Sequence, residues 1–373
     1  MNKRLFLSSP HMSDEGYELE YIHDAFQKNW IAPLGENVNE FEKAIGSYIG
    51  KEYTVALSCG TAALHLALLQ LGVGHGDMVF CQNLTFSASA NPIAYVGAQP
   101  VFIDSEVDTW NMDPRSLEKA ISLYGKPKAV IVVHLYGNPA KMDEIQTICK
   151  EQGIPLIEDA AEALGSIYHG QKCGSFGVYS AMSFNGNKII TTSGGGMLIC
   201  SDKDSAAHAL KLATQAREPV AWYQHEEIGY NYRMSNISAG IGRGQMKVLQ
   251  LRVQQKQAIF ARYCEKLKGL PLTMQPKLDC AETNRWLSVL LLDADCGVTP
   301  TDMLARLNEA NMEGRHLWKP MSLQPVFGGS PFVSVSDAPV CDDLFARGVC
   351  LPSDTKMRMD DVDRVCEVIR GMF

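Results

Sequence analysis

The sequence lacks the features that direct a protein to a membrane, to an oxidising compartment or to nucleic acid. No apolar run approaches the ~20 residues of a membrane-spanning helix, and the N-terminal segment has no long apolar stretch typical of a secretory signal. The 11 cysteines form no Cys-x-x-Cys pair and their number is odd, so we predict no metal site and a reduced, cytoplasmic compartment. The net charge of −8 argues against a general grip on nucleic acid, but is compatible with a local basic pocket for a small anion.

Two signatures of nucleotide chemistry are also missing. An oxidoreductase that binds a dinucleotide would carry G-x-G-x-x-G after its first strand, where this chain has S-C-G-T-A-A at residues 58–63. The glycine-rich segment near residue 190 lacks the G-K-[ST] order of a phosphate-binding P-loop. Hydride transfer and nucleotide hydrolysis by these routes are therefore unsupported.

The composition is that of a packed enzyme, with 46% hydrophobic and 20% charged residues. From residue 53 to about residue 202, short apolar runs alternate with longer helical patterns, which predicts an α/β fold with a mostly parallel sheet covered by helices on both faces. The predicted strands are 53–58, 78–82, 99–104, 128–135, 155–159, 179–184 and 195–201.

The pattern changes after Gln245, where a long polar-apolar helical segment leads into a turn-rich stretch. Beyond it, R-W-L-S-V-L-L-L-D-A-D predicts a strand, T-P-T-D-M-L-A-R-L-N-E-A-N-M a helix and D-D-V-D-R-V-C-E-V-I-R-G-M-F a closing helix. We predict a large domain over residues 1–245, including the N-terminal segment, and a smaller C-terminal α+β domain over residues 246–373.

The first candidate site is the turn S-C-G-T-A-A, which ends a predicted strand and opens the helical run T-A-A-L-H-L-A-L-L-Q-L-G. Exposed N–H groups at a helix start bind anions, so Gly60, Thr61 and Ala62 could form a phosphate seat together with the Thr61 hydroxyl. The alternative is an ordinary strand-to-helix turn with no ligand.

The second candidate is Asp159, at the carboxyl end of a predicted buried strand, where ligands of such sheets usually bind. If its partner is a pyridine nitrogen, the carboxylate keeps that nitrogen protonated and the ring becomes an electron sink. The alternative is an Asp that caps a following helix. Of the nearby Glu158 and Glu162, we expect one to face solvent.

The third candidate is Lys188, which lies 29 positions after Asp159, before the run Gly194, Gly195 and Gly196. A lysine behind a strand end can form an imine if desolvation leaves its amine neutral, whereas the alternative is a loop lysine in water. The three candidates occur in the order phosphate turn, carboxylate, lysine, and this order argues against a chance occurrence of the three motifs.

With these residues in place, the whole chain resembles the DegT/DnrJ/EryC1/StrS sugar aminotransferases, which are fold-type-I pyridoxal phosphate enzymes. The motifs that carry the resemblance are S-C-G-T-A-A-L-H-L-A-L, I-E-D-A-A-E-A-L-G-S, S-F-N-G-N-K-I-I-T-T-S-G-G-G-M and G-Y-N-Y-R-M-S-N-I. Three further segments, H-L-Y-G-N-P-A-K-M-D-E-I, N-W-I-A-P-L-G and R-H-L-W-K-P, look like the branch that aminates UDP-2-acetamido-4-keto-2,6-dideoxyglucose on the way to bacillosamine-type sugars.

The resemblance implies roles for individual residues. It makes Lys188 the imine lysine and proton shuttle, Asp159 the partner of the pyridine nitrogen, and Thr61 and Ser183 phosphate ligands beside the amides of Gly60 and Ala62. Phe86 would cover the cofactor ring, although plain core packing is its alternative. Two further assignments are Glu162, where the family commonly has Gln or His beside the ring hydroxyl, and Asn231, which would reach the cofactor phosphate of a neighbouring subunit.

The reaction implied by the resemblance passes an amino group from L-glutamate through pyridoxamine phosphate to the keto sugar, in a homodimer with shared sites. For sugar and nucleotide contacts we predict a set with a cationic character. It comprises Pro33, Leu34, Gly35, Asn185, Arg233, His316, Trp318 and Lys319, with Ile31 and Ala32 next to them.

Several alternatives remain beside this one. The substrate could be a 3-keto or dTDP-linked sugar, and a sugar 3-dehydratase of the same fold would replace the lysine by histidine, against which Lys188 argues. A non-catalytic regulator that binds the cofactor would add a DNA-reading module, for which neither N-terminal room nor a basic helix-turn-helix pattern is evident.

Overall fold

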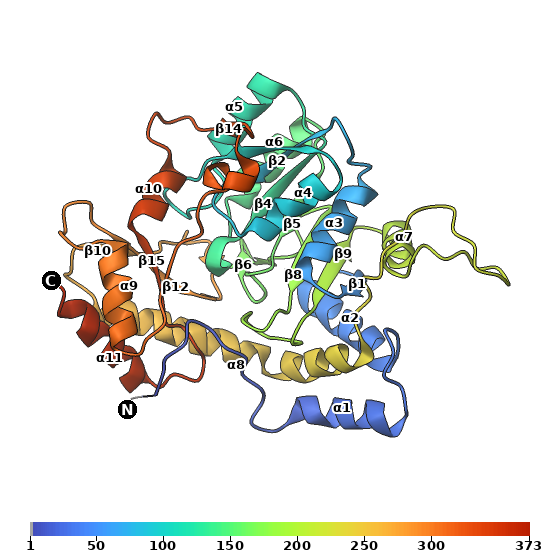
Figure 1. Ribbon diagram of the computed structural model, residues 1–373, viewed down its shortest axis with the longest axis horizontal. Coiled ribbons are helices and arrows are strands. Elements are labelled where there is room, and N and C mark those ends of the chain that lie inside the picture. The colour runs from blue at the N-terminus through green and yellow to red at the C-terminus, as the bar shows by residue number, and fades with distance from the viewer. Residues whose placement is uncertain (1–2) are drawn as a thin grey trace.

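A mixed eight-stranded sheet forms the centre of the computed structural model, which describes residues 3–373 (Figure 1). Its strand order is β1-β9-β8-β5-β4-β2-β3-β14, and all neighbours pair in parallel except β9, which is antiparallel to β8 and β1. The strands are β1 (Tyr53–Leu57), β2 (Met78–Gln82), β3 (Gln99–Ile103), β4 (Ala129–Val133), β5 (Leu156–Asp159), β8 (Tyr179–Ser183), β9 (Gly196–Cys200) and β14 (Phe332–Val333).

The seven predicted strands are confirmed, with ends that differ by at most two residues. Strand β4 shows why they could be found, because its residues A-V-I-V-V are mostly β-branched and all five are buried. The eighth strand, β14, was not predicted, since it is only two residues long and comes from the C-terminal part of the chain.

Helices cover both faces of this sheet. The helices before the long helix α8 are α1 (Tyr17–Gln27), α2 (Glu36–Ile49), α3 (Gly60–Gln70), α4 (Asn91–Tyr95), α5 (Pro114–Tyr124), α6 (Met142–Glu151) and α7 (Lys203–Ala213). On β2, Val79 and Cys81 pack into the core formed with α3, α4 and α7, whereas Phe80 packs into the core formed with α5 and α6. This alternation is the period of a strand buried on two faces, and it confirms the predicted three-layer α/β arrangement.

The C-terminal part forms a smaller α+β unit around a second sheet of order β10-β12-β15-β13, all antiparallel. Its elements are β10 (Leu272–Met274), β12 (Ser288–Leu292), α9 (Pro300–Glu309), β13 (Arg315–His316), α10 (Val340–Arg347), β15 (Gly348–Leu351) and α11 (Met359–Arg370). The remaining short elements are β6 (Ile167–Tyr168), β7 (Gln171–Lys172), β11 (Ala281–Glu282), η1 (Ser87–Ser89), η2 (Leu135–Gly137), η3 (Met321–Leu323) and η4 (Pro325–Phe327).

Helix α8 (Asn236–Lys266) joins the two parts (Figure 1). Position 245, the predicted boundary, lies inside this 31-residue helix, so no flexible linker marks it. The division into domains at that residue therefore stays a prediction. No helix within residues 3–373 is both long and apolar enough to cross a bilayer.

The glycine run before β9 fixes how closely the start of α3 approaches the sheet. A Cβ atom on Gly196 would lie 2.3 Å from the carbonyl carbon of Cys59, and one on Gly195 would lie 2.1 Å from Thr192 Oγ1. A Cβ on Gly194 would touch nothing closer than 3.9 Å. Two of the three glycines are therefore required by close packing: Gly196 lets the S-C-G-T-A-A turn lie against the sheet, and Gly195 makes room for Thr192.

Candidate active site

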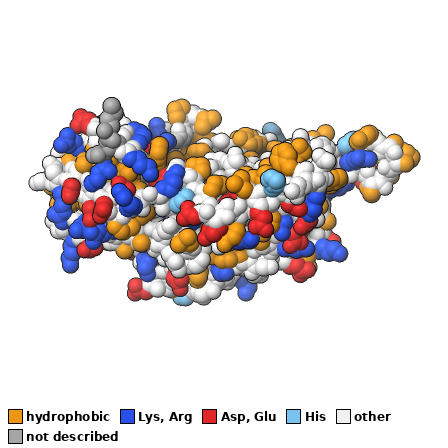
Figure 2. All heavy atoms as spheres, turned by 90° about the horizontal axis from the view of Figure 1, so that it is seen from below, with side chains coloured by type: hydrophobic (Ala, Val, Ile, Leu, Met, Phe, Trp, Pro, Cys, Tyr) orange, Lys and Arg blue, Asp and Glu red, His pale blue; other side chains and the backbone are white. Residues whose placement is uncertain are grey.

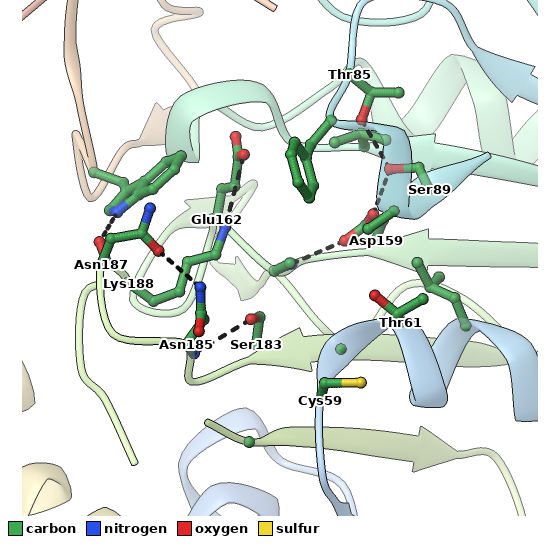
Figure 3. A pocket seen from close by; sticks show the side chains of 18 of the residues that line it. Cys59, Thr61, Thr85, Ser89, Asp159, Glu162, Ser183, Asn185, Asn187 and Lys188 are labelled. Carbon is green, nitrogen blue, oxygen red and sulfur yellow. Dashed lines mark hydrogen bonds and ion pairs between the residues drawn. The ribbon is translucent and has the colours of Figure 1, made fainter. Parts of the chain in front are cut away.

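The carboxyl ends of β5 and β8 and the first turn of α3 enclose a cavity of about 320 Å³ (Figure 3). Nine of the predicted site residues line it, and they come from segments spread over most of the chain. These nine are Gly60, Thr61, Phe86, Asp159, Glu162, Ser183, Asn185, Lys188 and Trp318.

The start of α3 forms one wall of the cavity. Cys59 caps the helix, and its Sγ accepts a hydrogen bond from the Ala62 N–H at 3.4 Å. The N–H groups of Gly60 and Thr61 belong to the first turn, whose donors have no acceptor within the helix. A Cβ on Gly60 would lie 3.2 Å from Ser183 Cβ, so both hydroxyls, of Thr61 and Ser183, can serve one anion at this helix terminus.

Asp159 ends β5 and is 5% exposed. Its Oδ1 accepts the Ala161 N–H at 3.1 Å and its Oδ2 accepts the Ser89 hydroxyl at 2.6 Å. Burial raises the pKa of Asp159, and this effect outweighs Ser89, the Ala161 N–H and the charge of Lys188, which lower it. A turn and not a helix follows Asp159, so the helix-capping alternative does not describe it.

Lys188 lies in the connection between β8 and β9 and points into the cavity (Figure 3). Its Nζ is 3.8 Å from Glu162 Oε1 and 4.1 Å from the centroid of the Trp286 ring. Only 12% of its side chain is exposed, so the alternative of a loop lysine in water is excluded.

Glu162 is buried beside Lys188 and its Oε2 accepts the Tyr136 N–H at 2.6 Å. Burial raises the pKa of Glu162, although the charge of Lys188 and the Tyr136 N–H lower it. The expectation that either Glu158 or Glu162 faces solvent is wrong, because both side chains are buried.

Aromatic rings line the side of the cavity next to the C-terminal unit. Phe86 and Trp318 lie with their ring centroids 5.1 Å apart, and Trp318 and Trp286 each stack near the buried Tyr136 ring, at 6.1 and 6.4 Å. Phe86 is 50% exposed, so core packing does not account for it. The rings can instead cover a flat ligand and exclude water from it.

The remaining predicted residues lie outside the cavity of this chain. Arg233 is bound to Glu42 Oε1 at 2.5 Å and to Ala56 O at 2.9 Å, and a Cβ on Gly35 would lie 2.5 Å from Asn236 Oδ1, so both have local structural roles. The others outside are Ala62, whose N–H is held by Cys59, Lys319 and the exposed Pro33, Leu34, Asn231 and His316. Their predicted contacts to ligand or partner stay predictions.

Several residues at the site were not predicted, and four of them contact the residues described above. Ser89 holds Asp159, Thr85 Oγ1 lies 2.8 Å from Ser89 Oγ, Trp286 lies against Lys188, and Tyr136 holds Glu162. Tyr136 adopts the left-handed backbone conformation with φ of 56°, which is uncommon for a bulky residue. Trp286 comes from the C-terminal unit, and nothing in its local sequence points to the cavity.

The side chains present fit pyridoxal phosphate, the cofactor that the resemblance implies. A helix start with two hydroxyls suits its phosphate, a buried carboxylate at the sheet edge suits its ring nitrogen, and a shielded lysine amine suits its aldehyde. Within the described residues, Lys188 is the one cation in the cavity lining, against the two carboxylates Asp159 and Glu162. The cationic lining expected for the substrates is therefore not supplied by this chain's own cavity.

Comparisons with known proteins give a consistent picture. The model of the DegT/DnrJ/EryC1/StrS aminotransferase family matches residues 13–370. The "Putative pyridoxal phosphate-dependent aminotransferase EpsN" of Bacillus subtilis (strain 168) is 52% identical over 379 residues, covering 100% of this chain and 97% of that protein. A GDP-perosamine synthase of Caulobacter vibrioides is 35% identical over 365 residues, covering 97% of this chain and 96% of that protein.

The fold of a solved relative agrees as well. The structure of DesI in the presence of its TDP-sugar product superposes with a TM-score of 0.90 at 26% identity, covering 100% of this chain and 93% of that one. The chain thus belongs to the DegT/DnrJ/EryC1/StrS aminotransferase family and is a pyridoxal phosphate-dependent sugar aminotransferase.

Proposed function

We propose that the enzyme transfers the amino group of L-glutamate to the 4-keto group of a UDP-linked 6-deoxy sugar, with UDP-2-acetamido-4-keto-2,6-dideoxyglucose as its substrate. The product is the UDP-4-amino sugar, used to build a glycan or exopolysaccharide. The observation that supports an aminotransferase reaction most directly is the Lys188 amine, shielded by Trp286 and placed in one cavity with Asp159.

The cavity residues divide the chemical work. Bound pyridoxal phosphate supplies an electron-poor ring that stabilises negative charge on the carbon from which a proton is removed. Asp159 holds the proton on the ring nitrogen, while Gly60, Thr61 and Ser183 hold the phosphate. Lys188 Nζ takes and returns a proton inside the cavity, and Phe86 keeps water from the ring. Glu162, 3.8 Å from Lys188, balances the charge of the amine when it is protonated.

A sugar attached to a nucleotide is the acceptor class that the relatives favour. The names of the similar proteins refer to a GDP-linked sugar in one case and a TDP-linked sugar in another. The choice of UDP for this chain rests on the segments N-W-I-A-P-L-G, H-L-Y-G-N-P-A-K-M-D-E-I and R-H-L-W-K-P. Within the cavity, Asn185 and Trp318 are the proposed sugar contacts.

We further propose that two copies of the chain share their active sites, because the cavity of one chain has too few cations for a phosphate, a diphosphate and the glutamate carboxylates. An arm between α7 and α8 extends away from the body, with Trp222, Tyr223 and Ile228 between 63% and 82% exposed. Figure 1 shows the arm at the right, and Figure 2 shows hydrophobic side chains at its tip. Asn231 lies exposed at its base, where it can reach a neighbouring cavity.

The substrate proposal is tested with purified protein, pyridoxal phosphate, L-glutamate and a panel of 4-keto and 3-keto sugars linked to UDP, GDP or TDP. Mass spectrometry and NMR identify the amino sugars formed. We expect the UDP-linked 4-keto sugar to be converted fastest. Faster conversion of a GDP-linked, TDP-linked or 3-keto substrate would refute the UDP-sugar proposal, and activity on simple keto acids alone would refute the sugar proposal altogether.

The role of Lys188 is tested separately with Lys188→Ala, compared with Lys172→Ala, whose amine instead binds the Tyr48 carbonyl. We expect Lys188→Ala to lose turnover and the absorbance of the lysine-bound cofactor while the circular dichroism of the fold is kept. Borohydride reduction of the native enzyme should attach the cofactor at Lys188. A label on any other lysine contradicts the assignment.

Shared sites are tested by mixing two inactive variants, Lys188→Ala and Asn231→Ala, after each is shown to be dimeric. In a mixed dimer one cavity carries both changes and the other carries neither. Activity should therefore reappear on mixing if Asn231 serves the neighbouring cavity. A mixture that exchanges subunits but stays inactive places Asn231 in its own chain's site.

A further inference from the structure

The N-terminal segment, residues 5–13, forms a strap that runs from the C-terminal unit along α8 to α1 (Figure 1). Leu5 forms a β-bridge with Met312, and the Ser353 N–H donates to Leu7 O at 2.9 Å. At the other end, Arg252 on α8 donates to Met12 O at 2.8 Å. The strap is therefore bonded to the C-terminal unit at one end and to the helix that joins the two parts of the molecule at the other.

In the middle of the strap, Ser8 contacts the segment that holds the cavity lysine. Its hydroxyl donates to Asn187 O at 2.9 Å, and the Trp286 indole N–H donates to the same oxygen at 2.6 Å. This carbonyl belongs to the peptide bond between Asn187 and Lys188. Two donors from distant parts of the chain thus fix the peptide plane from which the Lys188 side chain begins.

A second lysine, Lys256 on α8, is hydrogen-bonded to Ser8 and so extends this set of hydrogen bonds. Its side chain is 2% exposed, and its amine donates to Ser8 Oγ at 3.0 Å. Within residues 3–373 it forms no ion pair, and burial lowers the pKa of Lys256 to about 7 although the charge of Asp354 raises it. Because the Lys256 amine donates to Ser8 Oγ, the hydroxyl hydrogen is directed at Asn187.

A buried amine without a carboxylate partner disfavours folding, and a methionine of similar length would fill the same space without that cost. Lys256 also lies outside the cavity, so it contacts neither cofactor nor substrate there. The contact that remains for its amine is the Ser8 hydroxyl. The amine therefore acts on the hydrogen bond between the Ser8 hydroxyl and the Asn187 carbonyl, and through that bond on the backbone of Lys188.

We propose that Lys256 and Ser8 are positioning residues that hold the Lys188 amine in the cavity through the Asn187 carbonyl. This inference rests on the role proposed for Lys188. It extends the active site to a strap residue and a helix residue that do not touch the ligands. No covalent step is assigned to Lys256.

The test compares Ser8→Ala with Ser9→Ala in full-length, cofactor-free protein. Ser9 is the matched control, because it lies on the same strap but donates from its N–H and hydroxyl to Asp354. Acylation of each lysine by an N-hydroxysuccinimide ester is followed by peptide mass spectrometry, with the exposed Lys43 as the internal reference. We expect Lys188 to react about five-fold faster in Ser8→Ala, because the loss of one hydrogen bond loosens its backbone.

Turnover provides the second reading. We expect kcat to fall about five-fold in Ser8→Ala, with KM for both substrates unchanged, and to return in Ser8→Thr, which restores the hydroxyl. Lys256→Met should reproduce the faster acylation of Lys188, while its thermal midpoint stays equal to that of the wild type or rises. Because this variant is expected to fold normally, the proposal can be tested even if Ser8→Ala folds poorly.

Unchanged Lys188 acylation in both Ser8→Ala and Lys256→Met overturns the proposal. Equal acceleration in Ser8→Ala and Ser9→Ala also overturns it, because general loosening of the strap would then be the cause. Acylation needs neither cofactor nor sugar, so these outcomes are independent of whether the enzyme accepts the proposed sugar substrate.

Discussion

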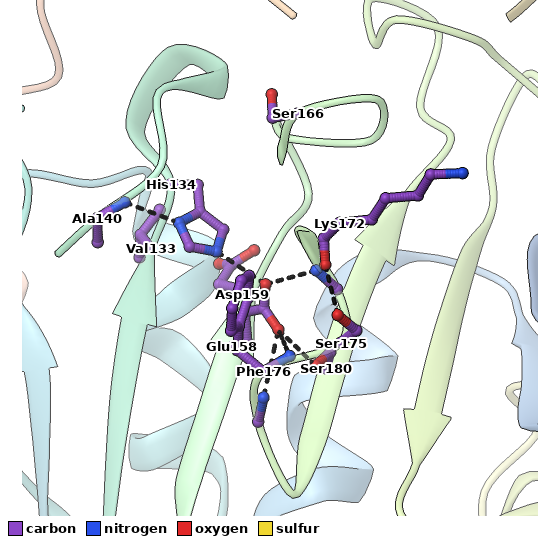
Figure 4. Close-up of polar contacts among 12 residues, drawn as sticks. Val133, His134, Ala140, Glu158, Asp159, Ser166, Lys172, Ser175, Phe176 and Ser180 are labelled. Carbon is purple, nitrogen blue, oxygen red and sulfur yellow. Dashed lines mark hydrogen bonds and ion pairs between the residues drawn. The ribbon is translucent and has the colours of Figure 1, made fainter. Parts of the chain in front are cut away.

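Glu158 and Asp159 are neighbours on β5, and both carboxylates are buried, yet their surroundings are opposite (Figure 4). Glu158 points away from the cavity and accepts five donors, whereas Asp159 faces the cavity and accepts two. The five donors to Glu158 are the His134 ring, the Ser180 hydroxyl and the N–H groups of Gly174, Phe176 and Gly177.

The pKa directions follow from these surroundings. Burial alone would raise the pKa of Glu158. The hydrogen bonds from His134 and from the N–H groups of Gly174 and Phe176 lower the pKa by more than burial raises it, so the net shift is downward. For Asp159 the balance is reversed and the net direction is up. A buried carboxylate that is saturated by its own protein stabilises the fold, whereas one left partly unsatisfied at a cavity is available to a ligand.

The cluster around Glu158 also includes Cys173, and its three side chains, of His134, Glu158 and Cys173, are spaced like metal ligands. The hydrogen bonds argue for a structural role. The Ala140 N–H donates to His134 Nδ1 at 3.1 Å, so Nε2 carries the hydrogen that is donated to Glu158. Five donors already occupy the lone pairs of the carboxylate, which leaves none for an ion.

The largest expected effect is the loss of stability when Glu158, the carboxylate with five donors, is replaced. Glu158→Gln turns one oxygen into an NH₂ group that faces donors, and we expect the free energy of unfolding to fall by ~3–5 kcal/mol, because lost hydrogen bonds to a charged group (~1.5–3 kcal/mol each) add to the penalty for buried donors left unpaired (~1–3 kcal/mol). Urea denaturation followed by fluorescence measures it. At temperatures where the variant is folded, its kcat should stay near that of the wild type, and a large loss of kcat there would place Glu158 among the functional groups.

The cavity carboxylate should show the opposite behaviour. Asp159→Asn removes the charge that pairs with the ring nitrogen, and we expect a loss of kcat of about 100-fold, corresponding to ~3 kcal/mol for a hydrogen bond to a charged group. In cofactor-free protein its unfolding free energy should equal or exceed that of the wild type, because the penalty for burying the charge is gone. Equal losses of stability in this variant and Glu158→Gln would erase the distinction between the two residues.

The contrast also shows how far the sequence could be read. The strand that ends at Asp159 was found from its apolar run, and Lys188 from its place after a strand end, because both signals are local. Which of Glu158 and Glu162 is buried depends on loops that follow β5, so the expectation that one faces solvent was wrong. Trp286 and Asn187 form their bond across 99 positions, and no local pattern encodes such a pairing.

Long-range partners also decide which charged residues are free to bind a ligand. Arg233 was predicted at the substrate because cations suit diphosphates, but Glu42, 191 positions earlier, binds its guanidinium. In the structure Arg233 pairs with Leu57 at the end of β1, and no local sequence pattern shows that a glutamate on α2 binds its guanidinium there. The reaction class was therefore readable from the sequence, whereas the hydrogen-bond partners of the site were not.

A smaller effect separates the two serines that serve these carboxylates. Ser89 donates to Asp159 at 2.6 Å and Ser180 to Glu158 at 2.9 Å, and each is buried. We expect Ser89→Ala to lower kcat about five-fold, the value of one hydrogen bond of ~1 kcal/mol, with little change in unfolding. Ser180→Ala should instead lower the free energy of unfolding by about 1 kcal/mol at unchanged kcat. Steady-state kinetics and urea curves on both variants test this exchange of effects.

The smallest expected effect is a difference in how stability depends on pH. The raised pKa of Asp159 means that the folded, cofactor-free protein binds a proton more tightly than the unfolded chain does. Its contribution is therefore most favourable below the ordinary Asp pKa of about 4 and becomes unfavourable as pH rises through the raised folded value. The lowered pKa of Glu158 gives the reverse, a stabilisation present above the ordinary Glu pKa of about 4.3 and lost as pH falls through the lower folded value.

Urea curves from acid to neutral pH should then show that Asp159→Asn gains stability over the wild type as pH rises. The stability that Glu158→Gln loses relative to the wild type should become smaller only in acid. Parallel pH profiles for the wild type and Asp159→Asn would mean that Asp159 titrates alike in the folded and unfolded chains, and the contrast between the neighbours would then lie in their hydrogen bonds alone.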